Sequence, residues 1–126
     1  MPTNPQKKVL VVDDSSTALM MSMTILSRGP YVLLAAHDGE EAVAKAKAER
    51  PDLIVMDVVM PRMNGIEACR ELRRCAETQM IPILLVTTRG EEHNVQQGLA
   101  SGCNGYLTKP INGPELLAKI RDYLAA

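Results

Sequence analysis

The chain has 126 residues, of which 46% are hydrophobic, and its formal net charge is −1. This length fits one domain with a sizeable core, and the composition excludes a disordered chain. Positive and negative charges are balanced, so the chain lacks the excess of basic residues that attracts nucleic acid or an anionic membrane surface. No apolar run approaches the ~18 residues of a membrane span. We therefore expect one globular domain that neither binds nucleic acid nor inserts into a membrane.

Apolar runs and amphipathic segments alternate along the chain after a flexible N-terminal tail of residues 1–6. The apolar runs predict strands at residues 9–12, 31–35, 53–56, 81–86 and 106–107. A segment with helical periodicity follows each run, which is typical of βα units around a parallel sheet. Unbroken apolar strands suit a sheet that is covered on both faces. The sequence therefore predicts an α/β domain of order (βα)5 over residues 7–126.

The first predicted helix follows the first strand directly. Ser15 or Ser16 can cap its start, and Gly29-Pro30 is its predicted end. Its expected inward residues are Leu19, Met23 and Leu26.

The second and third helices begin with the spacing of a capping box. Asp38 and Asn64 each stand three residues before a glutamate, Glu41 and Glu67 respectively. The expected inward residues are Ala42, Val43 and Ala46 in the second helix, and Ile66, Cys69 and Leu72 in the third.

The last two helices differ in the strength of their signals. Residues 91–101 form the weakest predicted helix, because Gly98 lies inside it and only Val95 and Leu99 are clear anchors. We expect this helix to be the most mobile element. Asn112 and Pro114 open the last helix, whose expected inward residues are Leu116, Leu117, Ile120 and Leu124.

Polar residues stand where the predicted strands end. Asp13 and Asp14 end the first strand, Asp57 the third, Thr87 the fourth and Lys109 the fifth. The carboxyl ends of parallel strands meet at one edge of the sheet, where ligands bind. We therefore expect these side chains to lie close together.

Simpler roles exist for each of these residues. Asp14 can be a helix cap, Thr87 can be structural, and Lys109 can be a solvated surface side chain. Asp57 precedes Val-Val-Met-Pro, which is not a helix start, so capping explains it poorly. The conjunction of all of them at one edge favours a functional site.

Three converging carboxylates need a compensating charge. Two carboxylates about 4 Å apart repel by roughly 4 kcal/mol at an effective dielectric constant near 20. Either one of them is protonated or a cation lies among them. Lys109 supplies one positive charge, and an all-oxygen set with open positions suits Mg²⁺.

Four motifs in order carry a resemblance to a known family. They are "VDDS" at Asp13-Asp14, "MDVVMPRMNG" around Asp57, "LLVTT" at Thr87, and "GYLTKP" with Lys109. With these motifs the chain resembles the response-regulator receiver domains, and in particular single-domain chemotaxis regulators, over residues 7–125. The resemblance implies a flavodoxin-like, doubly wound sheet with strand order 2-1-3-4-5.

The resemblance also implies the roles of the acidic residues. Asp57 would accept a phosphoryl group from the phosphohistidine of a histidine kinase. Asp14, Asp57 and the backbone carbonyl of Val59 would bind Mg²⁺, and Asp13 would bind it directly or through water. Such a domain catalyses its own phosphorylation and dephosphorylation but is not a conventional turnover enzyme.

The remaining implied roles concern signalling. Thr87 would hydrogen-bond the phosphoryl group, Lys109 would pair with it, and Lys109-Pro110 would be a cis peptide. Tyr106 would be the switch residue that follows Thr87. The signal would pass through the surface of the fourth helix, fifth strand and fifth helix to an unknown protein target, and a phosphorylation-dependent dimer is possible in this family.

Two positions depart from the pattern of the best-known chemotaxis regulators. Val59 replaces a polar residue often found two positions after the phosphoacceptor, and Arg89 replaces an acidic one two positions after Thr87. Both positions flank the path of the attacking water in the family, so they would tune the phosphoryl lifetime. The sequence also resembles receivers of pilus- and gliding-motility chemosensory systems.

Three rival functions share parts of the pattern. A flavodoxin needs a hydroxyl-rich phosphate loop where Asp13 and Asp14 stand, and a dehalogenase-type phosphatase needs an acid where Val59 stands. A non-phosphorylated pseudo-receiver would lack part of the site. The chain is either a stand-alone receiver or a receiver excised from a longer regulator or hybrid kinase with an output domain.

The cysteines and the N-terminus indicate the compartment. Cys69, Cys75 and Cys103 are odd in number and lack CxxC spacing, so we expect reduced thiols in a cytoplasmic protein. The two histidines do not cluster with them in sequence, so a zinc site is not expected. The N-terminus lacks the apolar segment of a signal peptide.

Overall fold

A computed structural model of the chain describes residues 6–88 and 92–124. Five parallel strands form one sheet in the order β2-β1-β3-β4-β5. The strands are β1 (Lys7–Val12), β2 (Tyr31–Ala36), β3 (Leu53–Asp57), β4 (Ile83–Thr88) and β5 (Gly105–Lys109). The predicted (βα)5 order and the strand order are confirmed. Residues 1–5 of the predicted tail lie outside the described residues.

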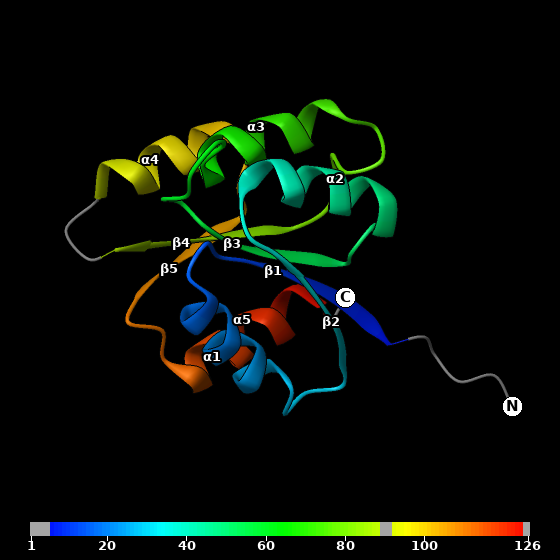
Figure 1. Ribbon diagram of the computed structural model, residues 1–126, viewed down its shortest axis with the longest axis vertical. Coiled ribbons are helices and arrows are strands. Elements are labelled where there is room, and N and C mark those ends of the chain that lie inside the picture. The colour runs from blue at the N-terminus through cyan, green and yellow to red at the C-terminus, as the bar shows by residue number, and fades with distance from the viewer. Residues whose placement is uncertain (1–5, 89–91, 125–126) are drawn as a thin grey trace, which may run out of the picture.

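Helices cover both faces of the sheet (Figure 1). On one face lie α2 (Gly39–Glu49), α3 (Gly65–Arg74) and α4 (Glu92–Ser101), and on the other lie α1 (Ser16–Leu26) and α5 (Gly113–Leu124). No helix among the described residues is both long enough and apolar enough to cross a membrane.

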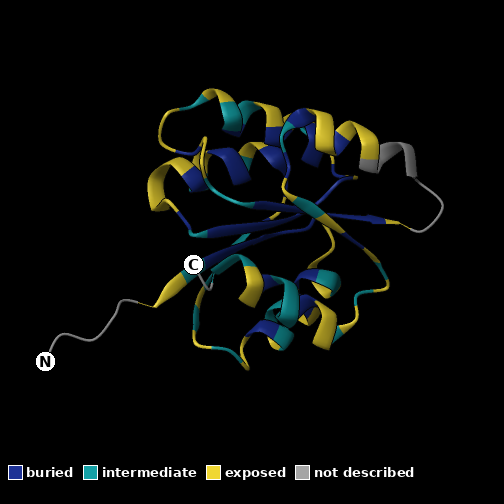
Figure 2. Cartoon of the chain, turned by 180° about the vertical axis from the view of Figure 1, so that it is seen from behind, coloured by how far each residue is buried: buried dark blue, intermediate teal, exposed yellow. Residues whose placement is uncertain are grey.

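The central strands supply both halves of the core because successive strand residues point to opposite faces. In β1, Val9 and Val11 pack into the cluster under α1 and α5, whereas Leu10 and Val12 pack into the cluster under α2 and α3. All five residues of β3 are buried, and Figure 2 shows the central strands as the buried middle of the molecule. Burying one such side chain fully contributes about 1.5–3 kcal/mol.

The capping predictions hold to different degrees. Asn64 and Glu67 form the complete reciprocal capping box of α3. Asp38 caps α2 by accepting from the Glu41 N–H at 2.8 Å, but the Glu41 side chain lies 3.4 Å from His37 Nδ1. Only one half of the second box is therefore present among the described hydrogen bonds.

Several element boundaries differ from the predicted ones by one to three residues, and all five strands differ at one end or both. β4 begins at Ile83 rather than residue 81, and α1 ends at Leu26, before Gly29-Pro30. β5 extends over five residues instead of two. This edge strand carries the polar residues Thr108 and Lys109, so its apolar signal in the sequence is short.

The interior of α4 corrects one expectation. Leu99, predicted as an anchor, is 51% exposed, and the side chain of Val95 lies outside the described residues. Gly98 faces the sheet instead: a Cβ there would lie 2.6 Å from Leu85 Cδ1. The glycine therefore permits close approach of helix and strand, and the expected mobility of α4 stays a prediction.

Most of the other side chains that were predicted to point inward are buried. Met23, Leu117 and Leu124 are the exceptions, because they are only partly buried against the cluster under α1 and α5.

Candidate functional site

The end of β1 places two carboxylates at the carboxyl edge of the sheet. Asp13 is buried, and its Oδ1 accepts from the Ser15 N–H at 2.9 Å. Ser15 is itself the N-cap of α1, with its hydroxyl accepting from the Ala18 N–H. The helix-cap role therefore belongs to Ser15, which leaves the exposed Asp14 free for another task.

Asp57 occupies the last position of β3. The register pairs Val12 with Met56, so the residues that follow Val12 lie level with Asp57. Asp57 is only 8% exposed. Its backbone carbonyl is packed so closely on α3 that a Cβ at Gly65 would lie 2.3 Å from it. A glycine is therefore required where α3 begins.

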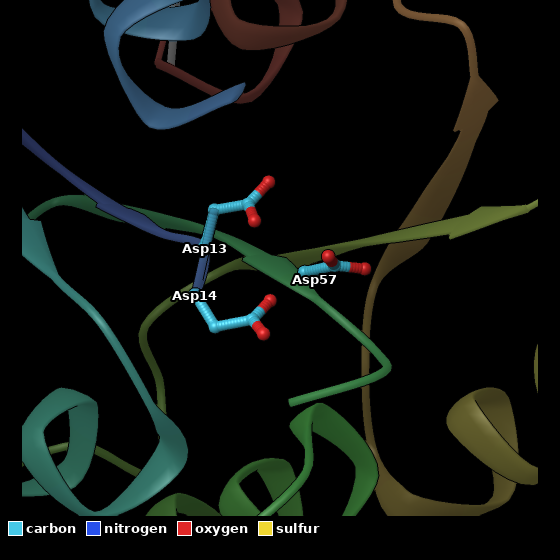
Figure 3. Close-up of side chains that lie close together, drawn as sticks. All are labelled: Asp13, Asp14 and Asp57. Carbon is cyan, nitrogen blue, oxygen red and sulfur yellow. The ribbon is translucent and has the colours of Figure 1, made fainter. Parts of the chain in front are cut away.

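The three carboxylates converge, as Figure 3 shows at the ends of β1 and β3. One carboxylate oxygen from each of Asp13, Asp14 and Asp57 lies within 4.8 Å of the other two. This all-oxygen set, with one member exposed, matches the donor chemistry of a hard divalent cation that keeps part of its water shell. These residues fit Mg²⁺, and no other metal-binding group of this kind occurs in the described part of the chain.

Lys109 balances part of this negative charge from the end of β5. Its Nζ lies 3.0 Å from Asp57 Oδ2 and 3.4 Å from Asp13 Oδ2. Burial alone would lower the pKa of Lys109, but the hydrogen bond and charge of Asp57, with help from Asp13, raise it. The ammonium is therefore firmly charged at neutral pH.

The charge on Asp57 is less favourable. Burial raises the pKa of Asp57, and the charge of Asp13 acts in the same direction. The hydrogen bond and charge of Lys109 and the Val59 backbone N–H act against this, but the net direction is upward. A carboxylate in this position favours any further cation or positive centre that approaches it.

The hydroxyl group of Thr87 is buried in an unusual environment. It is 4% exposed, and its Oγ1 is buried without a hydrogen-bond partner among the described residues. Leaving a buried hydroxyl unpaired costs about 1–3 kcal/mol. Since Thr87 lies in β4, next to β3 with Asp57 and to β5 with Lys109, this hydroxyl is available to a ligand at the same edge.

The remaining predicted residues lie around this centre. Tyr106, in β5, is 42% exposed and Val59 is 61% exposed. The peptide bond between Lys109 and Pro110 is cis. Arg89 lies outside the described residues.

Sequence reasoning missed two contacts that tie the loop between β3 and α3 to the start of α2. Arg62 Nε donates to Asp38 Oδ2 at 3.1 Å, and the Gly39 N–H donates to the Met63 carbonyl at 3.0 Å. The sequence pattern indicates only a helix cap at Asp38. Arg62 has a left-handed backbone in this pairing, with φ of 68°, and no short sequence pattern signals that conformation for an arginine.

The cysteines take no part in this site. Cys69 and Cys103 are buried, and all three cysteines are free. Burial raises the pKa of both buried thiols, so they are protonated at neutral pH and poor metal ligands.

Comparison with known proteins identifies the family. The model of the response regulator receiver domain matches residues 9–121. The chain belongs to this family. It is a receiver domain of two-component systems, and not a flavodoxin or a dehalogenase-type phosphatase.

Two curated relatives differ in how much of their length this receiver covers. Protein PilH of Pseudomonas aeruginosa is 40% identical over 118 residues, which are 94% of this chain and 98% of PilH. The alkaline phosphatase synthesis transcriptional regulatory protein PhoP of Bacillus subtilis is 42% identical over 94% of this chain but only 48% of PhoP. The receiver thus spans about half the length of some relatives and nearly all of another.

Two solved structures share the receiver fold. The chemotaxis response regulator CheY4 of Vibrio cholerae has a TM-score of 0.88 and 38% identity, covering 95% of this chain and all of CheY4. The receiver domain of a Pseudomonas aeruginosa sensor histidine kinase, with a magnesium ion coordinated in its active site cleft, has a TM-score of 0.89 and 27% identity over 97% of this chain and all of that one. The predicted likeness to chemotaxis and motility receivers is confirmed.

Proposed function

We propose that Asp57 is the phosphoacceptor and takes its phosphoryl group from a phosphohistidine of a histidine kinase. A carboxylate oxygen of Asp57 attacks the phosphorus, the P–N bond to the imidazole breaks, and the electron pair returns to the imidazole nitrogen. The observation that carries this proposal is the convergence of Asp13, Asp14 and Lys109 on the buried Asp57.

The neighbouring residues stabilise the transferred group by position and charge, which is what phosphoryl transfer chiefly requires. Asp13, Asp14, Asp57 and the Val59 carbonyl would hold the metal. Bound Mg²⁺ would neutralise carboxylate and phosphoryl charge together. Lys109 would pair with one phosphoryl oxygen, and the unpaired Thr87 hydroxyl would donate to another.

The same residues would connect phosphorylation to a partner. Thr87 would move toward the new charge, Tyr106 would turn inward from its exposed position, and the surface formed by α4, β5 and α5 would change. That surface would bind a protein target or a second copy of the chain. We place this receiver, residues 7–126, in the cytoplasm, in a chemotaxis or motility pathway as the likeness to PilH and CheY4 suggests.

An alternative arrangement joins this receiver to an output domain. The match to half of PhoP, a transcriptional regulatory protein, favours that arrangement, and the match to nearly all of PilH favours a receiver that acts alone.

Phosphorylation with a small donor tests the assignment. Purified protein is incubated with acetyl phosphate and Mg²⁺, and the modification is measured by intact mass and mapped by peptide sequencing. We expect one phosphoryl group per chain, on Asp57, and none when EDTA replaces Mg²⁺.

Two variants make this test specific. Asp57→Asn should abolish incorporation, whereas Asp52→Asn, at the opposite end of the sheet, should leave it unchanged. Incorporation at the wild-type level in Asp57→Asn would disprove the assignment, and no incorporation in the wild type would indicate a pseudo-receiver.

A further inference from the structure

The loop between β3 and α3 is tied to the start of α2 by two contacts outside the acidic site. One is the ion pair of Arg62 with Asp38 at 3.1 Å, and the other is the hydrogen bond from the Gly39 N–H to the Met63 carbonyl at 3.0 Å. The Asp38 side chain is 10% exposed and the Arg62 side chain 67%. The guanidinium therefore reaches inward from the surface to a nearly buried carboxylate.

This tie holds the loop in a demanding conformation. Arg62 has φ of 68°, a region that residues with a Cβ rarely adopt. A Cβ at Gly39 would lie 2.2 Å from the Met63 carbonyl oxygen, so the two segments are in close backbone contact. The ion pair and the hydrogen bond select one loop conformation among those open to the chain.

The other end of the same loop enters the acidic site. The Val58 N–H donates to the Val86 carbonyl of β4, and the Val58 carbonyl accepts from the Gly65 N–H. The Val59 backbone N–H acts on Asp57 by favouring its charged form and lowering its pKa. Val59 and Arg62 are three positions apart in this short loop, so breaking the tie would be felt in the backbone next to Asp57.

We propose that Asp38 and Arg62 are positioning residues for divalent-cation binding, because their ion pair holds the β3–α3 loop in the conformation that presents Val59 to the three carboxylates. Neither residue touches the cation. The inference rests on the proposed magnesium site. When fewer molecules hold the competent loop conformation, the apparent dissociation constant rises in proportion.

Two single variants remove the ion pair and keep the local structure. Asp38→Ser keeps an oxygen that can accept from the Glu41 N–H and cap α2. Arg62→Asn removes the guanidinium and leaves a residue that tolerates a left-handed backbone. We expect each to weaken Mg²⁺ binding to the unphosphorylated protein about threefold, measured by calorimetry with MgCl₂.

The double variant and a conservative variant separate positioning from general damage. Because both single changes remove the same interaction, the double variant should bind Mg²⁺ no more weakly than either one. Arg62→Lys should recover part of the affinity. In EDTA, hydrogen exchange of the Gly39 amide should accelerate in both single variants.

Glu49→Ala is the matched control, since it removes the exposed ion pair with Lys8 at the other end of α2. It should leave the Mg²⁺ affinity unchanged. Wild-type affinity in both Asp38→Ser and Arg62→Asn, or an equal loss in Glu49→Ala, would overturn the positioning role alone. Absence of Mg²⁺ binding in the wild type would overturn the proposed metal site, and the positioning role with it.

Discussion

At the scale of single residues, burial makes the charge on Asp57 unfavourable in the metal-free site and raises its pKa. Its raised pKa means that the folded protein holds the Asp57 proton more tightly than the unfolded chain does. The resulting stabilisation is complete below the ordinary aspartate pKa of about 3.9 and is lost as the pH rises through the folded-state pKa. At neutral pH the charged Asp57 therefore costs stability, which Lys109 offsets only in part and a bound divalent cation would offset further.

Neutralising Asp57 should stabilise the metal-free protein. We expect Asp57→Asn to melt about 4 °C above the wild type in EDTA at pH 7, which corresponds to ~1 kcal/mol for a domain of this size. The difference should shrink as the pH falls through the raised pKa of Asp57, because the wild-type carboxyl then becomes neutral, and also on addition of Mg²⁺. Differential scanning calorimetry at several pH values measures it.

A remote aspartate serves as the control for this change. Asp52→Asn alters a carboxylate whose Oδ2 accepts from the Lys8 N–H at 2.8 Å, far from the acidic site. It should not raise the melting temperature. A lower melting temperature for Asp57→Asn than for the wild type in EDTA would contradict a repulsive cluster of carboxylates.

Val59 bears on the lifetime of the phosphorylated state. Its side chain is exposed beside the site, and it can neither orient a water molecule nor accept its proton. Together with Arg89 it should slow the attack of water on the aspartyl phosphate. We expect Val59→Asn combined with Arg89→Glu to shorten the lifetime about tenfold, equivalent to ~1.4 kcal/mol of barrier, in single-turnover dephosphorylation with excess Mg²⁺.

A control variant at a second exposed valine tests whether the shorter lifetime comes only from a more polar surface. Val32 lies near the start of β2 and is 38% exposed, so Val32→Asn should leave the lifetime unchanged. An unchanged or longer lifetime in the double variant at positions 59 and 89 would show that these side chains do not control the water.

At the scale of elements, β4 and β5 are paired strands, and they would form the proposed connection between the site and the outer surface. The register pairs Leu85 with Tyr106 and Thr88 with Lys109. Thr87 and Tyr106 therefore lie on neighbouring strands, two positions apart along the sheet. A shift of Thr87 toward the phosphoryl group would therefore act on the edge strand that carries Tyr106.

Removing the Thr87 hydroxyl should uncouple Tyr106 from the phosphoryl group. We expect Thr87→Ala to accept a phosphoryl group but to transmit little change to Tyr106, because the proposed hydrogen bond is lost. The measurement is the NMR chemical shift of Tyr106 on adding beryllofluoride, which stands in for the phosphoryl group, with Mg²⁺.

The neighbouring threonine provides the comparison. Thr88 is exposed and points to the opposite face of β4, so Thr88→Ala should respond like the wild type. Equal shifts of Tyr106 in Thr87→Ala and the wild type would refute the proposed coupling.

At the scale of the whole molecule, the sequence predicts the sheet and the residues at its carboxyl edge. Buried apolar strands leave an unambiguous pattern, and a parallel sheet brings the strand ends to one edge. The amino-acid pattern alone therefore places Asp13 and Asp57 together. The same pattern makes the edge strand β5 too short, because residues of an edge strand that face solvent need not be apolar.

Packing between distant segments could not be predicted in the same way. Leu99 has the spacing of an inward residue, yet the close approach of Gly98 to Leu85 turns it outward. The ion pair of Asp38 with Arg62 likewise depends on the backbone path of two loops 24 residues apart, and no local pattern encodes that distance.

The position of Lys109 in the chain also affects how the protein is made. Its contacts reach back 96 residues to Asp13 and 52 residues to Asp57. During synthesis on the ribosome, the carboxylates of β1 and β3 emerge long before the lysine that balances them. A chain that lacks β5 therefore carries these carboxylates without the ammonium that balances them, and cations from the surrounding solution, Mg²⁺ among them, would have to screen the acidic cluster until Lys109 takes its place in the fold.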